Sequence, residues 1–463
     1  MKILLVNPQD LDNINTRLPK SLNTAQGVYP PLGIAYIAAV LEQNDYNVNI
    51  LDCKALNLTT EELKSYLHHT NPDLVGVTAM CSTVKGAFEA ARLAKEVGAT
   101  VVIGGPQLSA YPQETLSFDF IDFGVVGEGE YVMLELVQAL EKGSDVKGIV
   151  GLAYKDNGKI FVNGDRIVEN IDDLPFPARH LLPMEKYHCV ITATPFATMI
   201  SSRGCPYKCG FCYKQPSDKR VRFRDQKNVV DEMELLIEEY KVKEIMFYDD
   251  SIAINRNHIS GICNEILNRG LDVKWESPIR IDNVDQSLLR LMNKAGCIRL
   301  RFGVESGNEN ILKLMNKGTS ISKIKDVFEW TNNAGIETFA YFIIGYASET
   351  PGTIRNSIEL AKDLDPDWVM FTAATPYPHT NLMELAEKSN LVEVDYWREF
   401  TLGKKESRIQ YLVDDAELWV SKAYKEFYLR PNFIIKKLKK LTSLDIFIKY
   451  FKGLYGIVIF KMK

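Results

Sequence analysis

The sequence has no long hydrophobic run: no stretch approaches the roughly 18 apolar residues of a membrane-spanning helix. Residues 1–7 are followed by polar sequence and not by a long apolar segment with a cleavage site, so we expect no signal peptide. A strong charge excess is also missing, because the formal net charge is only −5. Nothing in the overall charge therefore points to nucleic acid.

Cysteines arranged as a disulfide framework are absent as well. Outside one short segment the eight cysteines are scattered, which favours free thiols in a reducing cytoplasm. Hydrophobic residues make up 46% of the chain and charged residues 25%, as in soluble globular proteins. A chain of 463 residues can form two or three domains, each with its own core.

The short segment is residues 201–213, which holds Cys205, Cys209 and Cys212 at C-x3-C-x2-C spacing directly after an apolar, strand-like run. Thiolates this close together suit an iron–sulfur cluster or zinc. A fourth cysteine is missing nearby, since the next is Cys263 in an expected helix. Three thiolates on a four-iron cluster would leave one iron open for a small molecule. A zinc site, or three thiols without a metal, is the alternative.

Strand and helix signals alternate over the first 145 residues. Apolar strands are expected at 2–6, 46–51, 73–78, 100–103 and 121–126, with amphipathic helices near 33–43, 60–69, 83–97 and 129–142. This alternation predicts a doubly wound, Rossmann-like parallel sheet, whose ligands bind beyond the carboxyl ends of the strands. The small and polar residues expected at those ends are Asn7, Thr78, Ser82, Gly104, Gly105 and Gly127. A nucleotide is a rival ligand, but no G-x-G-x-x-G motif follows the first strand.

Residues 146–190 are predicted to be a linker, with a hairpin around Lys155-Asp156-Asn157-Gly158. The alternation resumes over residues 191–385, with strands near 196–201, 244–249, 273–277, 298–304, 338–344 and 368–373. Six β–α units in place of eight suggest an incomplete TIM-like barrel, in which side chains at the carboxyl ends of the strands face the active site. The polar residues expected there are Tyr248, Asp249, Asp250, Glu276, Arg280, Glu305 and Ser306.

The cysteine spacing, with Phe211 directly before the third cysteine, resembles the radical S-adenosylmethionine (SAM) enzymes. The sequence around Asn7-Pro8, 29–33, 103–106 and 127–130 looks like the cobalamin-binding domain that precedes many of them. The resemblance implies a 4Fe–4S cluster on the three cysteines, an open iron that binds the amino and carboxylate groups of SAM, and a bound cobalamin.

The chain departs from other cobalamin proteins in one respect. The D-x-H-x-x-G motif that supplies an axial histidine to cobalt is absent. The first 145 residues contain only His68 and His69, at the end of an expected helix. We therefore expect cobalamin to bind without a histidine ligand.

The resemblance also suggests how SAM is held. An arginine suits its carboxylate and a buried acid its ribose hydroxyls, so we expect Arg280 to bind the carboxylate and Glu305 the ribose. Gly345 corresponds to a glycine motif beside the adenine, and 376–378 to the exit of the sixth strand. Phe211 is expected to adjoin the cofactor, with packing in the core as the alternative.

The function implied by the resemblance is methylation of an unactivated carbon in a lipid-like or natural-product substrate. One SAM would methylate the cobalt and another would give the deoxyadenosyl radical, with electrons from a flavodoxin- or ferredoxin-type donor. Oxidation, cyclisation or deoxygenation without methyl transfer is a second outcome. A cobalamin-binding sensor is an alternative of another class.

Residues 386–463 are expected to form a C-terminal helical segment without recognisable chemistry. From Arg430 onward nine Lys or Arg accompany one acid, Asp445, and apolar residues recur at helical spacing. Such a basic amphipathic tail can lie on an anionic membrane surface. The alternative is a terminal helix docked on the body of the protein.

Overall fold

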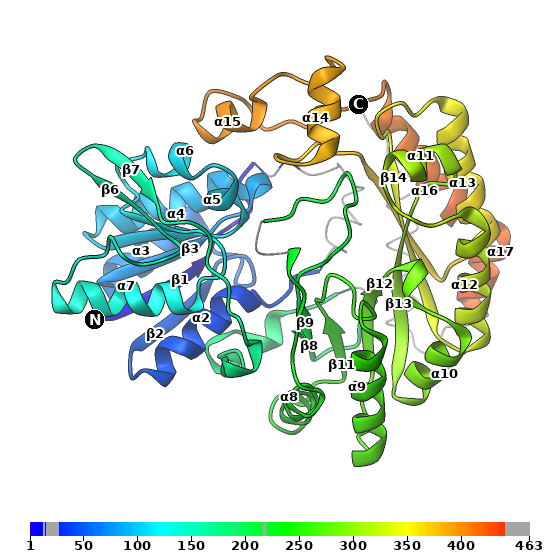
Figure 1. Cartoon of the computed structure of the whole chain (residues 1–463), viewed down its shortest axis with the longest axis horizontal. Helices are drawn as coiled ribbons and strands as arrows, with labels where there is room; N and C mark the ends of the chain where they lie inside the picture. The colour runs from blue at the N-terminus through cyan, green and yellow to red at the C-terminus, as the bar shows by residue number, and fades with distance from the viewer. Residues whose placement is uncertain (13, 15–26, 190, 216–218, 440–463) are drawn as a thin grey trace.

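The computed structural model describes residues 1–12, 14, 27–189, 191–215 and 219–439. Its two large sheets, one mixed and one parallel, lie side by side, each flanked by helices (Figure 1). The C-terminal helices α14 (Asn381–Lys388) and α15 (Tyr396–Thr401) run along one side of the two halves of the molecule that these sheets form. No helix of the described ranges is long and apolar enough to span a membrane.

The first sheet has the order β2-β1-β3-β4-β5-β6-β7. Its strands are β1 (Lys2–Asn7), β2 (Asn47–Asp52), β3 (Leu74–Thr78), β4 (Thr100–Gly104), β5 (Phe123–Val125), β6 (Leu152–Asp156) and β7 (Lys159–Val162). Its helices are α2 (Leu32–Gln43), α3 (Thr60–Thr70), α4 (Val84–Glu96), α5 (Pro106–Ala110), α6 (Pro112–Leu116) and α7 (Glu130–Lys142). The strands β1 to β5 pair in parallel, which confirms the predicted Rossmann-like architecture.

Side chains of β1 alternate between two cores. Ile3 and Leu5 pack with α2 and α7 on one face, while Leu4 and Val6 pack with α3 and α4 on the other. This period of two is what a strand covered by helices on both faces requires. The sheet is therefore doubly wound.

The hairpin predicted within the linker lies elsewhere than expected. Its strands β6 and β7 pair antiparallel onto β5 and extend the first sheet at its edge. The turn Asn157-Gly158, with φ of 49° and 73°, gives the hairpin, as the sequence indicated. Its edge pairing with β5 depends on a long-range contact that local sequence does not encode.

The second sheet has six parallel strands in the order β15-β14-β13-β12-β11-β8. They are β8 (Phe196–Met199), β11 (Glu244–Phe247), β12 (Trp275–Ile279), β13 (Cys297–Glu305), β14 (Glu337–Ile344) and β15 (Trp368–Ala373). The helices between them are α8 (Gln226–Glu238), α9 (Arg256–Arg269), α10 (Gln286–Lys294), α11 (Glu309–Leu314), α12 (Ile321–Asn333) and α13 (Pro351–Leu364). Within the described residues β8 and β15 are unpaired edges, so the barrel is incomplete, as predicted.

One strand boundary moves a predicted site residue. Glu276 was expected at the carboxyl end of the third barrel strand, which is wrong, because β12 begins at Trp275 and places Glu276 near its start. The buried Glu276 carboxylate instead pairs with Arg299 (2.9 Å) and Arg301 (2.7 Å) of the neighbouring strand β13. Its role is to balance charge inside the barrel.

The C-terminal segment consists of α14 (Asn381–Lys388), α15 (Tyr396–Thr401), α16 (Ala416–Tyr428) and α17 (Pro431–Lys439). The start of α17 is docked, because Phe433 is 4% exposed and packs against Phe427. Arg430 and Lys436 also pair with Asp365. The rest of the predicted basic tail, residues 440–463, lies outside the described residues.

Candidate functional site

The three cysteines lie in a loop that starts and ends in a small antiparallel ribbon. Strand β9 (Ser202–Arg203) leads into the loop and β10 (Arg222–Phe223) follows it, with Arg222 opposite Arg203. Cys205 and Cys209 are partly exposed and Cys212 is exposed, and none of them forms a disulfide. Among the described residues no three His, Cys, Asp or Glu side chains converge as a single metal ion requires. The three thiols stay accessible within one short loop, which is compatible with the predicted iron–sulfur cluster.

A buried carboxylate anchors the start of the cysteine loop. The backbone N–H groups of Ser201 and Ser202 donate to Asp249 Oδ1 at 2.8 and 2.6 Å, and both hydroxyls donate to the same carboxylate. Burial raises the pKa of Asp249 to about 6, although these hydrogen bonds oppose the rise. Asp249 was predicted at a strand end that faces the site, and it lies directly beneath the loop.

The far side of the loop rests on the barrel. Gly210 N–H donates to Met315 O and Gly210 O accepts from Leu382 N–H, both at 2.8 Å. A Cβ on Gly210 would lie 2.8 Å from the Tyr346 hydroxyl, so a side chain there would displace the loop. Phe211 packs on the apolar cluster around Met315 and Tyr346. The loop is thus held at both ends and at its centre.

Arg280 reaches the cysteine loop from the end of β12. Its Nη1 donates to Cys209 Sγ at 3.2 Å, its Nη2 pairs with Asp282 at 2.9 Å, and its guanidinium lies 3.7 Å from the centre of the Tyr207 ring. The predicted role of Arg280, to bind the SAM carboxylate, stays a prediction. Its position beside Cys209 is compatible with that role.

Glu305 ends β13 in a strained conformation, with a φ of 68° that only glycine adopts readily. Its Oε1 accepts from Lys317 Nζ at 2.7 Å in a buried ion pair, and the same ammonium lies 5.8 Å from the centre of the Phe211 ring. Sequence reasoning missed Lys317, since a lysine twelve residues after a strand end gives no local signal. The pair brings one anion and one cation to the edge of the cysteine loop.

Gly345 ends the fifth barrel strand, β14, with a φ of 80°. The N–H groups of Gly345 and Tyr346 donate to Glu349 Oε2 at 2.7 and 3.0 Å, while Glu349 Oε1 is buried without a partner. Burial raises the pKa of Glu349 to about 7, against the effect of the two N–H donors. The turn that was predicted beside the adenine therefore depends on one buried carboxyl group.

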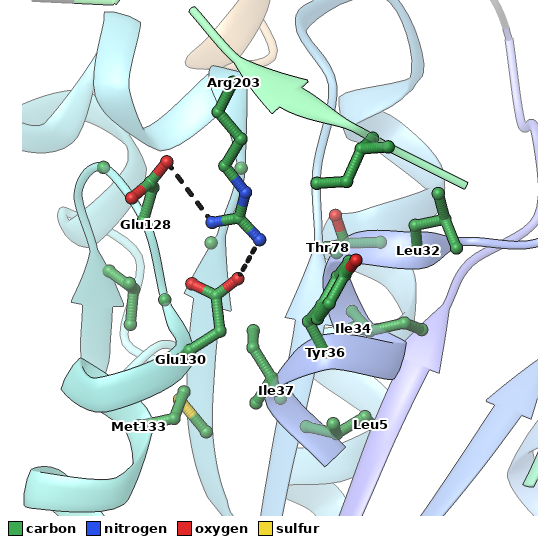
Figure 2. A pocket seen from close by; sticks show the side chains of 18 of the residues that line it. Leu5, Leu32, Ile34, Tyr36, Ile37, Thr78, Glu128, Glu130, Met133 and Arg203 are labelled. Carbon is green, nitrogen blue, oxygen red and sulfur yellow. Dashed lines mark hydrogen bonds and ion pairs between the residues drawn. The ribbon is translucent and has the colours of Figure 1, made fainter. Parts of the chain in front are cut away.

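A pocket of about 530 Å³ lies between the carboxyl edge of the first sheet and the start of the cysteine loop. Figure 2 shows side chains of α2, α7 and the cysteine ribbon that line it. Thr78, Gly104, Gly105 and Gly127, all predicted from the sequence, are among its lining residues. From the second half of the chain it is lined by Ile200, Ser202, Arg203, Gly204, Tyr248 and Asp250.

The local backbone itself requires two of the glycines that line the pocket. Gly105 and Gly127 have φ of 98° and 84°, which disfavours any side chain at these positions. A Cβ on Gly105 would lie 2.7 Å from Ala79 O. His68 and His69 lie exposed on α3 and do not line the pocket, so the expected absence of a histidine ligand is compatible with this geometry.

Two predicted residues are not among those that line this pocket. Asn7 Nδ2 donates to Asp52 Oδ1 at 2.8 Å, and Ser82 O accepts from Ile14 N–H at 2.9 Å. Both follow strand ends, but the Asn7 side chain is engaged by Asp52, and for Ser82 the contact is made by the backbone carbonyl. Glu128 and Glu130, which belong to the predicted segment 127–130, and Arg203 also line the pocket. Their pairing was not predicted, because it joins the two halves of the chain.

Two family models match the chain. Residues 199–361 match the radical SAM superfamily, and residues 21–137 match the B12 binding domain. The uncharacterized methyltransferase PH0819 of Pyrococcus horikoshii is 35% identical over 444 residues, which cover 95% of each chain. An anaerobic magnesium-protoporphyrin IX monomethyl ester cyclase of Rubrivivax gelatinosus is 31% identical, over 88% of this chain and 75% of the cyclase.

Solved structures share the fold at lower identity. The radical SAM methyltransferase TsrM of Kitasatospora setae superimposes with a TM-score of 0.69 at 22% identity, over 85% of this chain and 79% of TsrM. The cobalamin-dependent radical SAM enzyme OxsB superimposes with a TM-score of 0.75 at 17% identity, over 98% of this chain and 70% of OxsB. The family matches and the two relatives in sequence agree with this shared fold. The chain belongs to the cobalamin-dependent radical SAM enzymes, whose cofactors are a 4Fe–4S cluster, SAM and cobalamin.

Proposed function

We propose that the protein transfers a methyl group to an unactivated carbon of a small-molecule substrate. This proposal rests on one observation: residues that lead into the cysteine loop also line the pocket of the first half of the chain. Ser202, Arg203 and Gly204, which lead directly to the cluster cysteines, also line the pocket at the carboxyl edge of the cobalamin-type domain. When bound, the cofactors supply a substrate radical and a methyl group.

The chain's own residues have separate tasks in this function. Cys205, Cys209 and Cys212 bind the cluster as thiolates. Glu305 and Lys317 offer complementary charges to the hydroxyl, ammonium and carboxylate groups of SAM, with Arg280 as a second cation. Gly345 leaves its turn free of a side chain that would crowd the adenine.

On the cobalamin side, Gly104, Gly105 and Gly127 let the ligand lie against backbone, and Thr78 supplies a hydroxyl at the strand end. Leu5, Ile34 and Ile37 give the pocket an apolar wall that excludes water around the reacting groups. Asn7 and Ser82 stay predicted ligand residues and would need contacts outside this pocket.

Ring closure without methyl transfer is the second candidate. It is favoured by the 31% identity to a protein named as a magnesium-protoporphyrin cyclase. Both candidates use the same residues around the cluster and SAM, so they differ in the fate of the substrate radical. Labelled methyl groups separate them.

The experiment uses the reconstituted full-length protein with SAM, a low-potential reductant and hydroxocobalamin under anaerobic conditions. We expect about four irons per chain, as three thiolates of a 4Fe–4S site imply, and release of deoxyadenosine. The variant with Cys205, Cys209 and Cys212 all changed to Ala should lose both. SAM labelled in its methyl group should yield labelled cobalamin for a methyltransferase and none for a cyclase. A sensor would bind cobalamin but release no deoxyadenosine.

We propose further that the substrate is lipid-like or a natural product, and that a flavodoxin- or ferredoxin-type protein supplies electrons where Cys212 is exposed. The sequence of residues 440–463 supports peripheral contact with anionic membranes, since five basic residues stand there against one acid. Each such charge contributes about 1 kcal/mol near an anionic surface, and the attraction fades with salt.

Co-sedimentation with anionic liposomes tests this membrane contact. The full-length protein should pellet with vesicles at low salt, and a chain that ends at Lys439 should not. Because the start of α17 is docked through Phe433, this end point keeps the folded body intact. If both proteins stay in the supernatant, the tail has no role at membranes and the support for a lipid-like substrate is lost.

A further inference from the structure

The two ends of the cysteine loop are held by the loop that follows β5 in the other half of the chain. Arg203 and Arg222 lie opposite each other in the β9–β10 ribbon, so both side chains leave the same face. Arg203 pairs with Glu130 at 2.6 Å and with Glu128 at 3.3 Å. Arg222 donates two hydrogen bonds to Glu128, at 2.7 and 2.8 Å. Arg203 and Arg222 thus form ion pairs with two carboxylates across the boundary between the two halves of the chain.

These pairs are built into the interior. The side chains of Arg203 and Glu130 are 14% and 4% exposed, and Arg203 also lies 5.2 Å from the centre of the Tyr36 ring. Burial alone would raise the pKa of Glu128, but hydrogen bonds from Arg222 and the charge of Arg203 hold it below its ordinary value. Pairs so little exposed are screened weakly, and loss of one partner leaves a buried charge.

One carboxylate oxygen of Glu130 has no hydrogen-bond partner. Its Oε1 accepts from Arg203, whereas its Oε2 is buried and has no hydrogen-bond partner. Glu130 also lines the pocket, and Figure 2 shows its carboxylate beneath the Arg203 guanidinium. A buried carboxylate oxygen without a partner is costly, so the natural donor is a ligand that fills the pocket.

We propose that Glu130 is a positioning residue that couples cobalamin binding to the cluster loop. Its Oε2 accepts a hydrogen bond from an amide N–H at the edge of the corrin, while its Oε1 holds Arg203 two residues before Cys205. The inference rests on the proposed function, because it takes cobalamin as the occupant of the pocket. Coupling of this kind is reciprocal: a formed cluster loop favours cobalamin, and cobalamin favours a formed loop.

The test measures hydroxocobalamin affinity of the full-length protein by anaerobic titration, with and without a reconstituted cluster. The variants are Glu130→Gln, Arg203→Lys and the matched control Glu135→Gln. Glu135 lies on the same helix α7 and pairs with Arg166, and it does not line the pocket. Thermal unfolding of each variant shows whether its fold is intact.

For the wild type we expect cluster loading to tighten cobalamin binding by about five- to tenfold, at the lower end of the usual coupling between sites. Glu130→Gln should weaken cobalamin binding about tenfold, as expected for a lost hydrogen bond to a charged group. It should also bring the ratio of the cobalamin affinities with and without the cluster close to one. Arg203→Lys keeps the positive charge but cannot pair with both carboxylates at once. It should therefore mainly lower the ratio of the cobalamin affinities measured with and without the cluster. Glu135→Gln should behave as wild type.

A spectroscopic readout separates coupling from a general loss of affinity. In excess dithionite, which keeps the cluster reduced and converts hydroxocobalamin to cob(II)alamin, saturating cobalamin should change the cluster component of the electron paramagnetic resonance spectrum in the wild type and not in Glu130→Gln. The proposal is overturned if Glu130→Gln binds cobalamin as the wild type does, or if cluster loading leaves the wild-type affinity unchanged. If Glu130→Gln fails to fold, the proposal is overturned when Arg203→Lys has the wild-type ratio of cobalamin affinities with and without the cluster. A wild type that binds no cobalamin contradicts the proposed function itself.

Discussion

Two buried carboxyl groups near the site, Glu349 and Glu128, have different partners, and their pKa values shift in opposite directions. Glu349 meets two backbone N–H groups, and burial raises its pKa to about 7. Glu128 is also buried, but Arg222 and Arg203 outweigh the burial and lower its pKa. The contrast follows from the partners, since an N–H dipole stabilises a carboxylate less than a full positive charge does.

Glu349→Gln tests the raised pKa. Because the folded form keeps its proton up to about pH 7 and the unfolded form loses it near pH 4.3, the wild type binds more protons when folded in this window. Wild-type stability should therefore fall relative to the variant as pH rises from about 4.5 to 7, by about 1–3 kcal/mol, and then level off. The measurement is the unfolding temperature of both proteins between pH 4.5 and 8.5.

Glu359→Gln, at an exposed position of α13, is the control and should track the wild type. Parallel curves for wild type and Glu349→Gln would mean that Glu349 is ionised throughout. The turn at Gly345 would then hold a carboxylate at every working pH.

At the scale of elements, the cysteine loop is shaped by its supports and not by its own sequence. Asp249 holds its start, Met315 O and Leu382 N–H hold Gly210, and the β9–β10 ribbon closes it. Such anchors limit the conformations of a loop before any cofactor binds, which lowers the entropy cost of binding.

Asp249→Asn should weaken cluster assembly. An asparagine of the same size can still accept both backbone N–H groups at one oxygen, but it places an NH2 group where Asp249 Oδ2 accepts from the Ser201 hydroxyl at 2.8 Å. Each lost hydrogen bond to a charged group costs about 1.5–3 kcal/mol. We expect fewer irons per chain after reconstitution and faster loss of the cluster to a chelator. Asp231→Asn, on the surface of α8, should keep the wild-type iron content. Equal iron content in both variants would show that the anchor is dispensable.

The elements themselves could be predicted because their signals are local. The buried strands of both sheets read as apolar runs, and their observed bounds lie within a few residues of the expected ones. The position of Gly105 and Gly127 at the pocket was also predictable, from strand ends, whereas the cluster role of the three cysteines stays a prediction. Asn7 and Ser82 follow strand ends equally well, yet neither lines the pocket, and the Asn7 side chain donates to Asp52. Lys317, Arg203 and Glu130 act through partners distant in sequence, which no local pattern reveals.

At the scale of the whole molecule, the C-terminal segment joins the two halves. Figure 1 shows α15 beside α6 of the first half. Tyr396, Trp397 and Phe400 of α15 share an apolar cluster with Val84 and Ala110 of that half. Polar contacts add to it: Gln107 Nε2 donates to Thr401 Oγ1 at 3.0 Å and Arg398 pairs with Glu114 at 2.7 Å. A segment that carries no chemistry therefore helps to fix the distance between the two cofactor regions.

Trp397→Ala tests whether this segment makes the two halves one cooperative unit. Trp397 is 3% exposed, stacks on Tyr377 with ring centres 5.4 Å apart, and donates to Pro376 O at 2.8 Å. Its truncation should cost about 3–5 kcal/mol through the lost burial and the cavity left behind. Because the loss falls at the contact between the halves, calorimetry should resolve two unfolding transitions where the wild type has one. Val394→Ala, at a 68% exposed position of the same segment, should keep the single transition. If Trp397→Ala also unfolds in one step at the wild-type temperature, the contacts around Glu128 and Arg203 alone suffice to hold the halves together.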